Sequence, residues 1–211
     1  MIMFSPFQIS EIIDTPSKLA ILRVFVSREG LKATGREISK LAGFCVSVTH
    51  GSLKDLHSRN ILNREIIGRQ HIYSLNEEDR IVQKVLRPMF EVENNYKEEI
   101  RDLLLEEIQK AGLKKSIVSM ILYGSVQKGT ARKGSDVDVA VVVSKAMDVD
   151  RIFEVFNSTI EDRFKSFFGV HLDFYVKSAM EFRKLLQKNQ PPISTLMKSY
   201  SVLYGKEPLE V

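Results

Sequence analysis

The stretch from Leu122 to Val143 constrains this chain more than any other part of its sequence. It reads LYGSVQKGTARKGSDVDVAVVV, so an apolar segment breaks at Gly124-Ser125 and a β-branched run resumes after a polar loop. A β-branched run of this kind is typical of a buried strand. Because successive strand side chains point to opposite faces, we expect Asp136 and Asp138 on the same face of that strand.

This pair of carboxylates predicts a cation. Two carboxylates held so close repel each other, and placing them near an apolar strand is costly without a compensating charge. A divalent cation supplies that charge, and oxygen-only ligands favour magnesium. Before the loop, a glycine lets the backbone approach a ligand, and amides at a following helix N-terminus attract phosphate. The combination predicts nucleotide chemistry.

The composition is that of an ordinary globular protein, but the charge is uneven. The 211 residues are 44% hydrophobic and 27% charged, and the single cysteine, Cys45, cannot form an internal disulfide. With neither a signal-peptide pattern at the start nor a long apolar run, we expect a cytoplasmic protein with no membrane partner. Residues 1–76 contain ten Lys/Arg against six Asp/Glu, which accounts for the whole net charge of +4. This excess favours a polyanion partner there.

The first third has the pattern of three helices and a hairpin. The expected elements are helices starting at Thr15-Pro16, at a Thr34/Glu37 capping box and over 46–59, and strands over 61–67 and 71–75. The segments REISKLAGF, SVTHGSLKDLHSRNIL and a hairpin ending in HIYSLN resemble the winged helix-turn-helix domains of prokaryotic transcription regulators. In such domains the third helix enters the major groove and the wing lies along the DNA backbone.

The resemblance implies a DNA-binding domain over residues 1–76. It places base contacts on the third helix, at Ser47, Val48, His50, Gly51 and Lys54, and phosphate contacts at Arg36, Lys40, Arg64 and Arg69. The alternative is a winged helix used for protein contacts or dimerisation.

Residues 77–111 are charged and are expected to be helical. We expect a helical connector over 77–94, in which Pro88 separates a helix over 77–86 from a second helix. The second helix has apolar residues at three-four spacing from Tyr96 to Ala111. It either opens the next domain or forms a dimer contact.

From Lys115 onward, strands and helices alternate, which indicates an α/β domain with a small sheet covered by helices on one side. The expected strands are 117–122, 136–143 and 170–176, and the expected helices are 125–130, 149–166, 178–188 and 194–199. The last strand carries a lone carboxylate, Asp173. If this strand lies beside the one that bears Asp138, three carboxylates converge and can hold two metal ions.

This pattern resembles the minimal, antitoxin-type nucleotidyltransferases of the polymerase-β-like superfamily. Their signature is a Gly-Ser, about ten further residues, an Asp-x-Asp and a later strand aspartate. The resemblance implies a polymerase-β-like fold with a small mixed sheet over 95–211. It assigns two Mg²⁺ ions to Asp136, Asp138 and Asp173, and triphosphate contacts to Gly124 and Ser125. Asp173 would also help to deprotonate the acceptor.

One departure from that family concerns the residues after the Gly-Ser. Family members usually have Ala-Arg-Gly there, whereas this chain has Gln127-Lys128-Gly129. Lysine keeps the positive charge but loses bidentate phosphate geometry. Lys128 is therefore the expected phosphate contact, and Arg132 is a candidate substitute.

The whole pattern predicts a two-domain α+β / α/β protein. The resemblance implies transfer of a nucleoside monophosphate, AMP from ATP or another nucleoside triphosphate, to a hydroxyl of a macromolecular acceptor such as a toxin-like protein. The DNA-binding domain would suit autoregulation, and a homodimer remains open. The alternative is a transcription regulator whose second domain only senses nucleotide. Transfer to a small molecule such as an aminoglycoside usually needs a larger acceptor domain than the 23 residues after Lys188.

Overall fold

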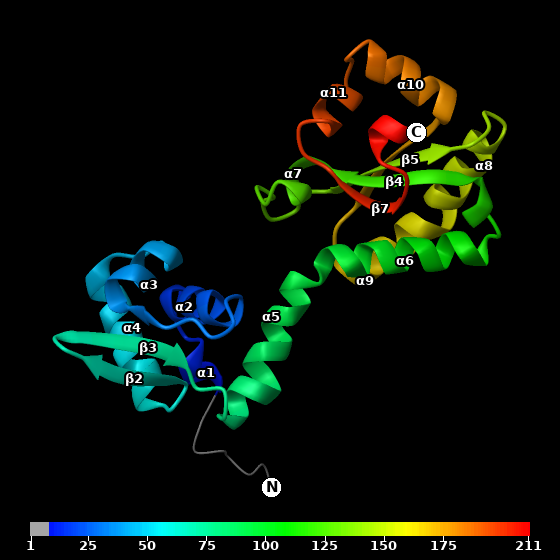
Figure 1. Cartoon of the computed structure of the whole chain (residues 1–211). Helices are drawn as coiled ribbons and strands as arrows, with labels where there is room; N and C mark the ends of the chain where they lie inside the picture. Colours follow the sequence, from blue (N-terminus) through cyan, green and yellow to red (C-terminus); the bar gives the residue numbers. More distant parts are fainter. Residues whose placement is uncertain (1–8) are drawn as a thin grey trace, which may run out of the picture. The chain divides into compact units, whose positions relative to one another are not determined.

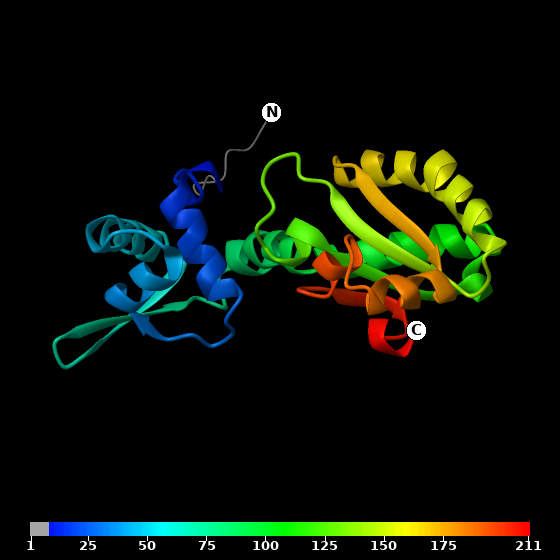
Figure 2. The same cartoon turned by 90° about the horizontal axis from the view of Figure 1, so that it is seen from above.

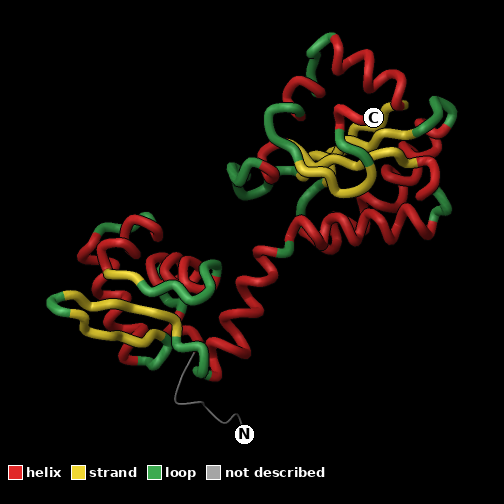
Figure 3. Tube along the Cα trace, viewed as in Figure 1, coloured by secondary structure: helices red, strands yellow, loops and turns green. Residues whose placement is uncertain are grey.

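The computed structural model describes residues 9–211, which form two compact units divided between Asn95 and Tyr96 (Figures 1 and 3). The first eight residues of the expected DNA-binding domain lie outside the described part. Each unit has its own hydrophobic core. No helix within residues 9–211 is both long and apolar enough to cross a bilayer.

The first unit is a winged helix-turn-helix. Its elements are α1 (Ile9–Ile12), α2 (Pro16–Val26), β1 (Ala33–Thr34), α3 (Gly35–Ala42), α4 (Val46–Ser58), β2 (Leu62–Ile67) and β3 (Gln70–Leu75). The antiparallel sheet has the order β1-β3-β2. The Thr34/Glu37 capping box forms, and the Thr15 side chain accepts the Lys18 N–H at the start of α2. The short strand β1 was not expected from the sequence.

The chain after the wing corrects one expectation. A π-helical turn, η1 (Val82–Leu86), continues directly into α5 (Arg87–Asn94), so Pro88 does not divide two helices. Proline lacks the N–H of a regular helical turn and its ring crowds the carbonyl four residues earlier. A π turn placed just before it widens the backbone at that point. Val82, Leu86 and Phe90 are buried in the core of the first unit.

The second unit is built on a four-stranded sheet. It begins with α6 (Tyr96–Lys110), and its strands are β4 (Ile117–Tyr123), β5 (Val137–Val143), β6 (Leu172–Ser178) and β7 (Ser201–Gly205). The other elements are η2 (Lys114–Ser116), α7 (Gly124–Gln127), α8 (Asp148–Val155), η3 (Phe156–Ile160), α9 (Glu161–Phe168), α10 (Ala179–Gln187), α11 (Ile193–Leu196) and η4 (Pro208–Glu210). The sheet order is β6-β5-β4-β7, with β5 and β6 parallel and the other pairs antiparallel. The predicted small mixed sheet is confirmed.

Helices cover both faces of this sheet, so the expectation of a one-sided cover was wrong. Val139 and Val141 pack with α6, α8 and α9, whereas Ala140 and Val142 pack with α10, α11 and the C-terminal Val211. Figure 1 shows the two helical layers, with α6 and α9 on one side of the sheet and α10 and α11 on the other. The cause is the uninterrupted apolar run of β5, because a strand without alternation is apolar on both faces.

Helix α6 belongs to the second core. Its residues Ile100, Leu104 and Ile108 are fully or almost fully buried against the sheet. The apolar stripe read from the sequence therefore opens the second unit. The strand β7, which extends the sheet beside β4, was not expected because SVLYG is too short to show a clear period.

Candidate functional site

Two acidic residues lie side by side on neighbouring parallel strands. Asp138 on β5 is in register with Asp173 on β6, and Tyr123 at the end of β4 is in register with Asp138 on its other side. Residues in register on paired strands share one face of a sheet. Tyr123, Asp138 and Asp173 therefore form a row across three strands, which we call the carboxylate row. The sequence-based expectation that the strand with Asp173 lies beside the strand with Asp138 is confirmed.

A glycine turn closes against this row. Gly124 has φ +79°, and a Cβ at that position would lie 1.9 Å from Oδ2 of Asp138. A side chain at this position would be strained by the positive φ and would displace the Asp138 carboxylate. At the next residue, the backbone N–H of Ser125 donates a hydrogen bond to the Asp138 carboxylate. The turn that the sequence predicted for phosphate thus contacts the predicted metal ligand directly.

The carboxylate row carries concentrated negative charge. Burial, together with the charges of Asp173 and Asp136, raises the pKa of Asp138, and only the Ser125 N–H and the Lys128 charge act against this. Burial and the charges of Asp138 and Asp173 raise the pKa of Tyr123 to about 12. A positive charge placed between such groups stabilises their ionised forms.

The remaining predicted residues of this site are less closely joined. Asp136 lies in the loop just before β5 and is exposed, so the expectation that it stands on the strand itself was wrong, although it is near enough to influence Asp138. Lys128 is exposed and its charge reaches Asp138. Arg132 is exposed farther along the loop, where its backbone N–H donates to the Ser135 hydroxyl. The geometry therefore favours Lys128 over Arg132 as the basic group of the site.

The donor set fits a hard divalent cation. Within residues 9–211, no group of three or more His, Cys, Asp or Glu side chains is close enough as it stands to hold a metal ion. The side chains on hand are nevertheless oxygen donors, and the raised pKa of Asp138 marks a carboxylate whose acidic neighbours lack compensation. Magnesium binds through one or two carboxylates together with substrate phosphates. A site of that kind needs fewer protein ligands than a closed metal cage.

Tyr123 is a member of the row that sequence reasoning missed. It is 7% exposed, lies in register with Asp138, and is influenced by the charges of both strand carboxylates. The signal was its place directly before Gly124, at the end of a strand paired with the acidic strand. Pairing between strands is not visible in a single sequence, so the tyrosine read as part of the apolar run.

The predicted DNA-contacting residues are all exposed. They are Arg36 and Lys40 on α3, Ser47, His50 and Lys54 on α4, and Arg64 and Arg69 on the wing. Within the described residues, none of the basic side chains among them forms a salt bridge, whereas Lys18, Arg23 and Arg59 in the same unit are paired with carboxylates. The basic side chains of this unit that form no salt bridge thus include those on the helices and wing that the motif places against DNA.

Several solved structures share weak similarity with parts of the chain. A predicted DNA-binding transcriptional regulator from E. coli is 16% identical, with a TM-score of 0.33 over 41% of this chain and 83% of that one. A toxin–antitoxin crystallised with AMP-PNP is 15% identical, with a TM-score of 0.34 over 51% and 74%. An archaeal chromatin protein, TrmBL2, is 13% identical, with a TM-score of 0.26 over 82% and 67%. At these scores the similarities support no conclusion about this chain.

No curated protein sequence matches the chain. The family model described as "Nucleotidyltransferase domain" does match it, over residues 101–200. That segment includes the glycine turn, the loop and the whole carboxylate row. The C-terminal half of this chain therefore contains a nucleotidyltransferase domain, as the Gly-Ser and Asp-x-Asp pattern predicted.

Proposed function

We propose that this protein transfers a nucleoside monophosphate, AMP from ATP, to a hydroxyl of a macromolecular acceptor. The observation that carries the proposal is the register of Asp138 with Asp173, beside a glycine turn in which a side chain would displace the Asp138 carboxylate. This arrangement places oxygen donors for a cation next to backbone amides suited to phosphate. Nucleotidyl transfer needs both.

In the proposed reaction, the acceptor oxygen forms a bond to the α-phosphorus while the bond between that phosphorus and the bridging oxygen breaks. Pyrophosphate leaves with the bonding electron pair, and the acceptor proton passes to a base. Two Mg²⁺ ions held by Asp136, Asp138 and Asp173 would neutralise the phosphates and activate the acceptor hydroxyl. Asp173, which is exposed at the strand start, would accept the proton.

The phosphates would lie on the glycine turn. Gly124 allows their close approach, and the backbone of Ser125 and the Lys128 ammonium group would hold the β- and γ-phosphates. The Lys128 charge acts against the raised pKa of Asp138, so this ammonium group influences the carboxylate row as well. A single ammonium group attracts phosphate without fixing its orientation.

The first unit would bind DNA. In this proposal α4 enters the major groove through Ser47, His50 and Lys54, while Arg36, Lys40, Arg64 and Arg69 contact phosphates. Together with transfer to a toxin-like protein partner, this would make an antitoxin-like protein that regulates its own transcription. The support is the exposure of these seven residues and their position on α3, α4 and the wing.

The test is transfer from labelled ATP to candidate protein acceptors, with magnesium or with chelator. Asp136→Asn/Asp138→Asn should abolish the labelled product, and Asp162→Asn, an exposed carboxylate on α9, is the matched control. The proposal fails if the label is transferred equally by the double variant and the native protein. Mass spectrometry of the acceptor distinguishes a bound nucleotidyl group from non-covalent ATP.

A second candidate is a transcription regulator that only senses nucleotide. The departure at Lys128 favours it, because a lysine attracts phosphate without fixing the orientation that in-line transfer requires. It predicts DNA binding that changes with ATP in the absence of any covalent product. Gel-shift titrations compare ATP with an analogue that cannot be cleaved between its α- and β-phosphates. Equal effects of the two nucleotides on DNA binding favour the sensor.

A further inference from the structure

Strand β6 has an open edge. It is the outermost strand of the order β6-β5-β4-β7 and pairs only with β5 within the described residues (Figure 2). The N–H of Val137 donates to the His171 carbonyl at 2.9 Å, so odd-numbered residues bond toward β5. In a parallel ladder the intervening residues, here Phe174 and Val176, carry their N–H and C=O groups toward the other edge. Groups of this kind are a template for another strand.

A cavity of about 360 Å³ follows this edge. It is lined by four consecutive residues of β6, from Phe174 to Lys177, and by Val149, Asp150 and Phe153 of α8. Successive strand side chains point to opposite faces, so a cavity that meets four in a row must lie along the strand's edge. Its wall includes Phe153, which is 49% exposed with its ring centroid 5.2 Å from that of Phe174. One side of the edge is therefore mainly apolar, with Asp150 as the one carboxylate among its lining residues.

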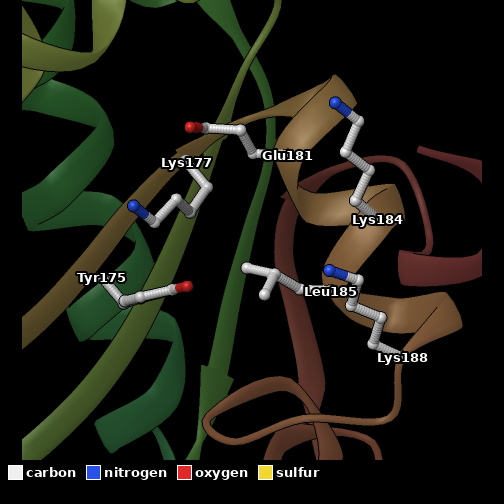
Figure 4. Close-up of a pocket in the computed structure, with 6 residues that line it drawn as sticks. All are labelled: Tyr175, Lys177, Glu181, Lys184, Leu185 and Lys188. Atoms are coloured by element: carbon white, nitrogen blue, oxygen red, sulfur yellow. The ribbon is translucent and has the colours of Figure 1, made fainter.

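The other side of the same edge is basic. A second cavity of about 330 Å³ shares Tyr175 and Lys177 with the first and reaches α10, where Lys184 and Lys188 line it together with Glu181 (Figure 4). None of the three lysines forms a salt bridge within residues 9–211. Lys177 instead lies over the Tyr175 ring, 5.5 Å from its centroid. Three ammonium groups against one carboxylate favour an anionic occupant.

We propose that the β6 edge binds an extended acidic segment of a partner protein as an added strand. Side chains of an added strand alternate between the two faces, so apolar residues would meet Phe153 and Phe174 while acidic residues meet the three lysines. Nucleic acid suits the site less well, since it offers no alternation of apolar and charged groups between the two sides of the edge. The occupant is a peptide that alternates apolar and acidic residues.

The docked segment would run past the carboxylate row. Asp173, Tyr175 and Lys177 share one face of β6, and Lys177 is four residues, roughly 13 Å, from Asp173. A segment with an acidic residue beside Lys177 then places the residue four positions away beside Asp173. A hydroxyl at that position would be the acceptor, an assignment that rests on the proposed transfer reaction, whereas the docking itself does not.

The first experiment measures docking without nucleotide. The probe is a fluorescein-labelled octapeptide of alternating valine and glutamate with blocked ends, titrated into the full-length protein. Binding should be at least about tenfold tighter than that of a valine–lysine peptide or of a block peptide of the same composition. Two further peptides carry N-methyl groups on every second backbone amide, one on the odd-numbered and one on the even-numbered residues. Methylation of the set that faces β6 should abolish binding, and methylation of the other set should leave it nearly unchanged. Equal effects of the two methylations would overturn strand addition.

The second experiment tests the lysines. Lys184→Glu should weaken the probe about tenfold or more, whereas Lys165→Glu, an exposed lysine on α9, changes the net charge equally and should leave affinity unchanged. Circular dichroism confirms that both variants fold. Equal losses would reduce the effect to net charge and overturn the proposal. A labelled single-stranded oligonucleotide that binds with Lys184 dependence, while the peptide does not, would overturn it in favour of nucleic acid.

The Asp136→Asn/Asp138→Asn variant separates this proposal from the transfer reaction. It should bind the probe as tightly as the native protein, because neither residue lines the two cavities. A peptide with a threonine four residues from a glutamate tests the acceptor assignment. If it binds but receives no nucleotidyl group, docking stands and only the acceptor assignment is removed. Transfer to a protein acceptor without peptide binding, in contrast, removes docking and leaves the proposed function.

Discussion

The two units present chemically opposite surfaces built in different ways. On the first, the predicted DNA-contacting lysines and arginines of α3, α4 and the wing are exposed and separate. None of them forms a salt bridge with another described residue. On the second, Asp138 touches the glycine turn, lies in register with Asp173 and is influenced by Asp136 and Lys128. The first is a set of independent charges and the second is a set of groups in contact.

This difference governs how each surface responds to substitution. Separate exposed charges contribute nearly additively, because each meets its own phosphate and is screened by water. Groups in contact respond together, since a shift of one atom changes distances and charges for all the others. We therefore expect large, steric effects in the second unit and small, graded ones on the face of the first.

The largest effect is expected from Gly124→Ala. Its methyl group would lie 1.9 Å from the Asp138 carboxylate, so the carboxylate must move, and transfer should fall at least about a thousandfold. The matched control is Gly129→Ala, which has a similar positive φ of +67° but nothing within 4 Å of the added Cβ. It should cost only the backbone strain, about 1–2 kcal/mol. Similar losses of transfer in both variants would show that contact with Asp138 is not decisive.

A second prediction concerns the one basic side chain of the first unit that is buried in an ion-pair network. Lys18 is 7% exposed at its side chain, with Nζ 2.5 Å from Asp55 and 3.0 Å from Asp14. Lys18→Ala should lower the free energy of unfolding of this unit by about 2–3 kcal/mol, because it removes a buried ammonium group that is paired with two partly exposed carboxylates. Lys32→Ala, from an exposed pair with Glu65, should cost less than about 1 kcal/mol. Urea denaturation followed by circular dichroism measures both, and equal costs would contradict the distinction.

A smaller effect is expected on DNA binding. Arg36→Ala and Arg69→Ala should each weaken binding to a labelled duplex of about 30 base pairs by roughly five- to tenfold and lower the salt slope by about one. In the double variant the two losses of binding free energy should add. Arg23→Ala removes a guanidinium already paired with Glu93 and should leave affinity unchanged. Strong non-additivity, or no salt dependence, would contradict the picture of independent charges.

The smallest effect concerns stability and pH. Because the pKa of Asp138 is raised in the folded state, the unfolded chain loses this proton first as pH rises above the ordinary aspartate value of about 3.9. The native protein should therefore lose stability relative to Asp138→Asn as pH increases through that range. The variant should be the more stable at neutral pH, with an advantage that shrinks on acidification and on addition of magnesium. Thermal melts between acidic and neutral pH check the sign, and an advantage that grows with acid would refute it.

Local patterns predicted much of this structure. The Thr34/Glu37 capping box, the helix start at Thr15 and the apolar stripe of α6 all formed where their residues predicted them. Each depends on residues within about four positions of one another, so the physical cause lies inside the pattern itself. The glycine turn and the apolar run of β5 are of the same kind, although Asp136 lies just outside that strand, and the family model covers both.

Long-range contacts decided the rest. Asp138 and Asp173 are 35 residues apart and meet only because β5 and β6 pair in one particular register. The cover on the second face of the sheet, the pairing of β7 with β4 and the position of Tyr123 likewise depend on segments that are distant in sequence. The sequence alone determined which side chains are candidates for the chemistry, because residue types and short spacings are local. Only the tertiary structure decided which of them share a surface, because strand pairing and packing are set by the whole domain.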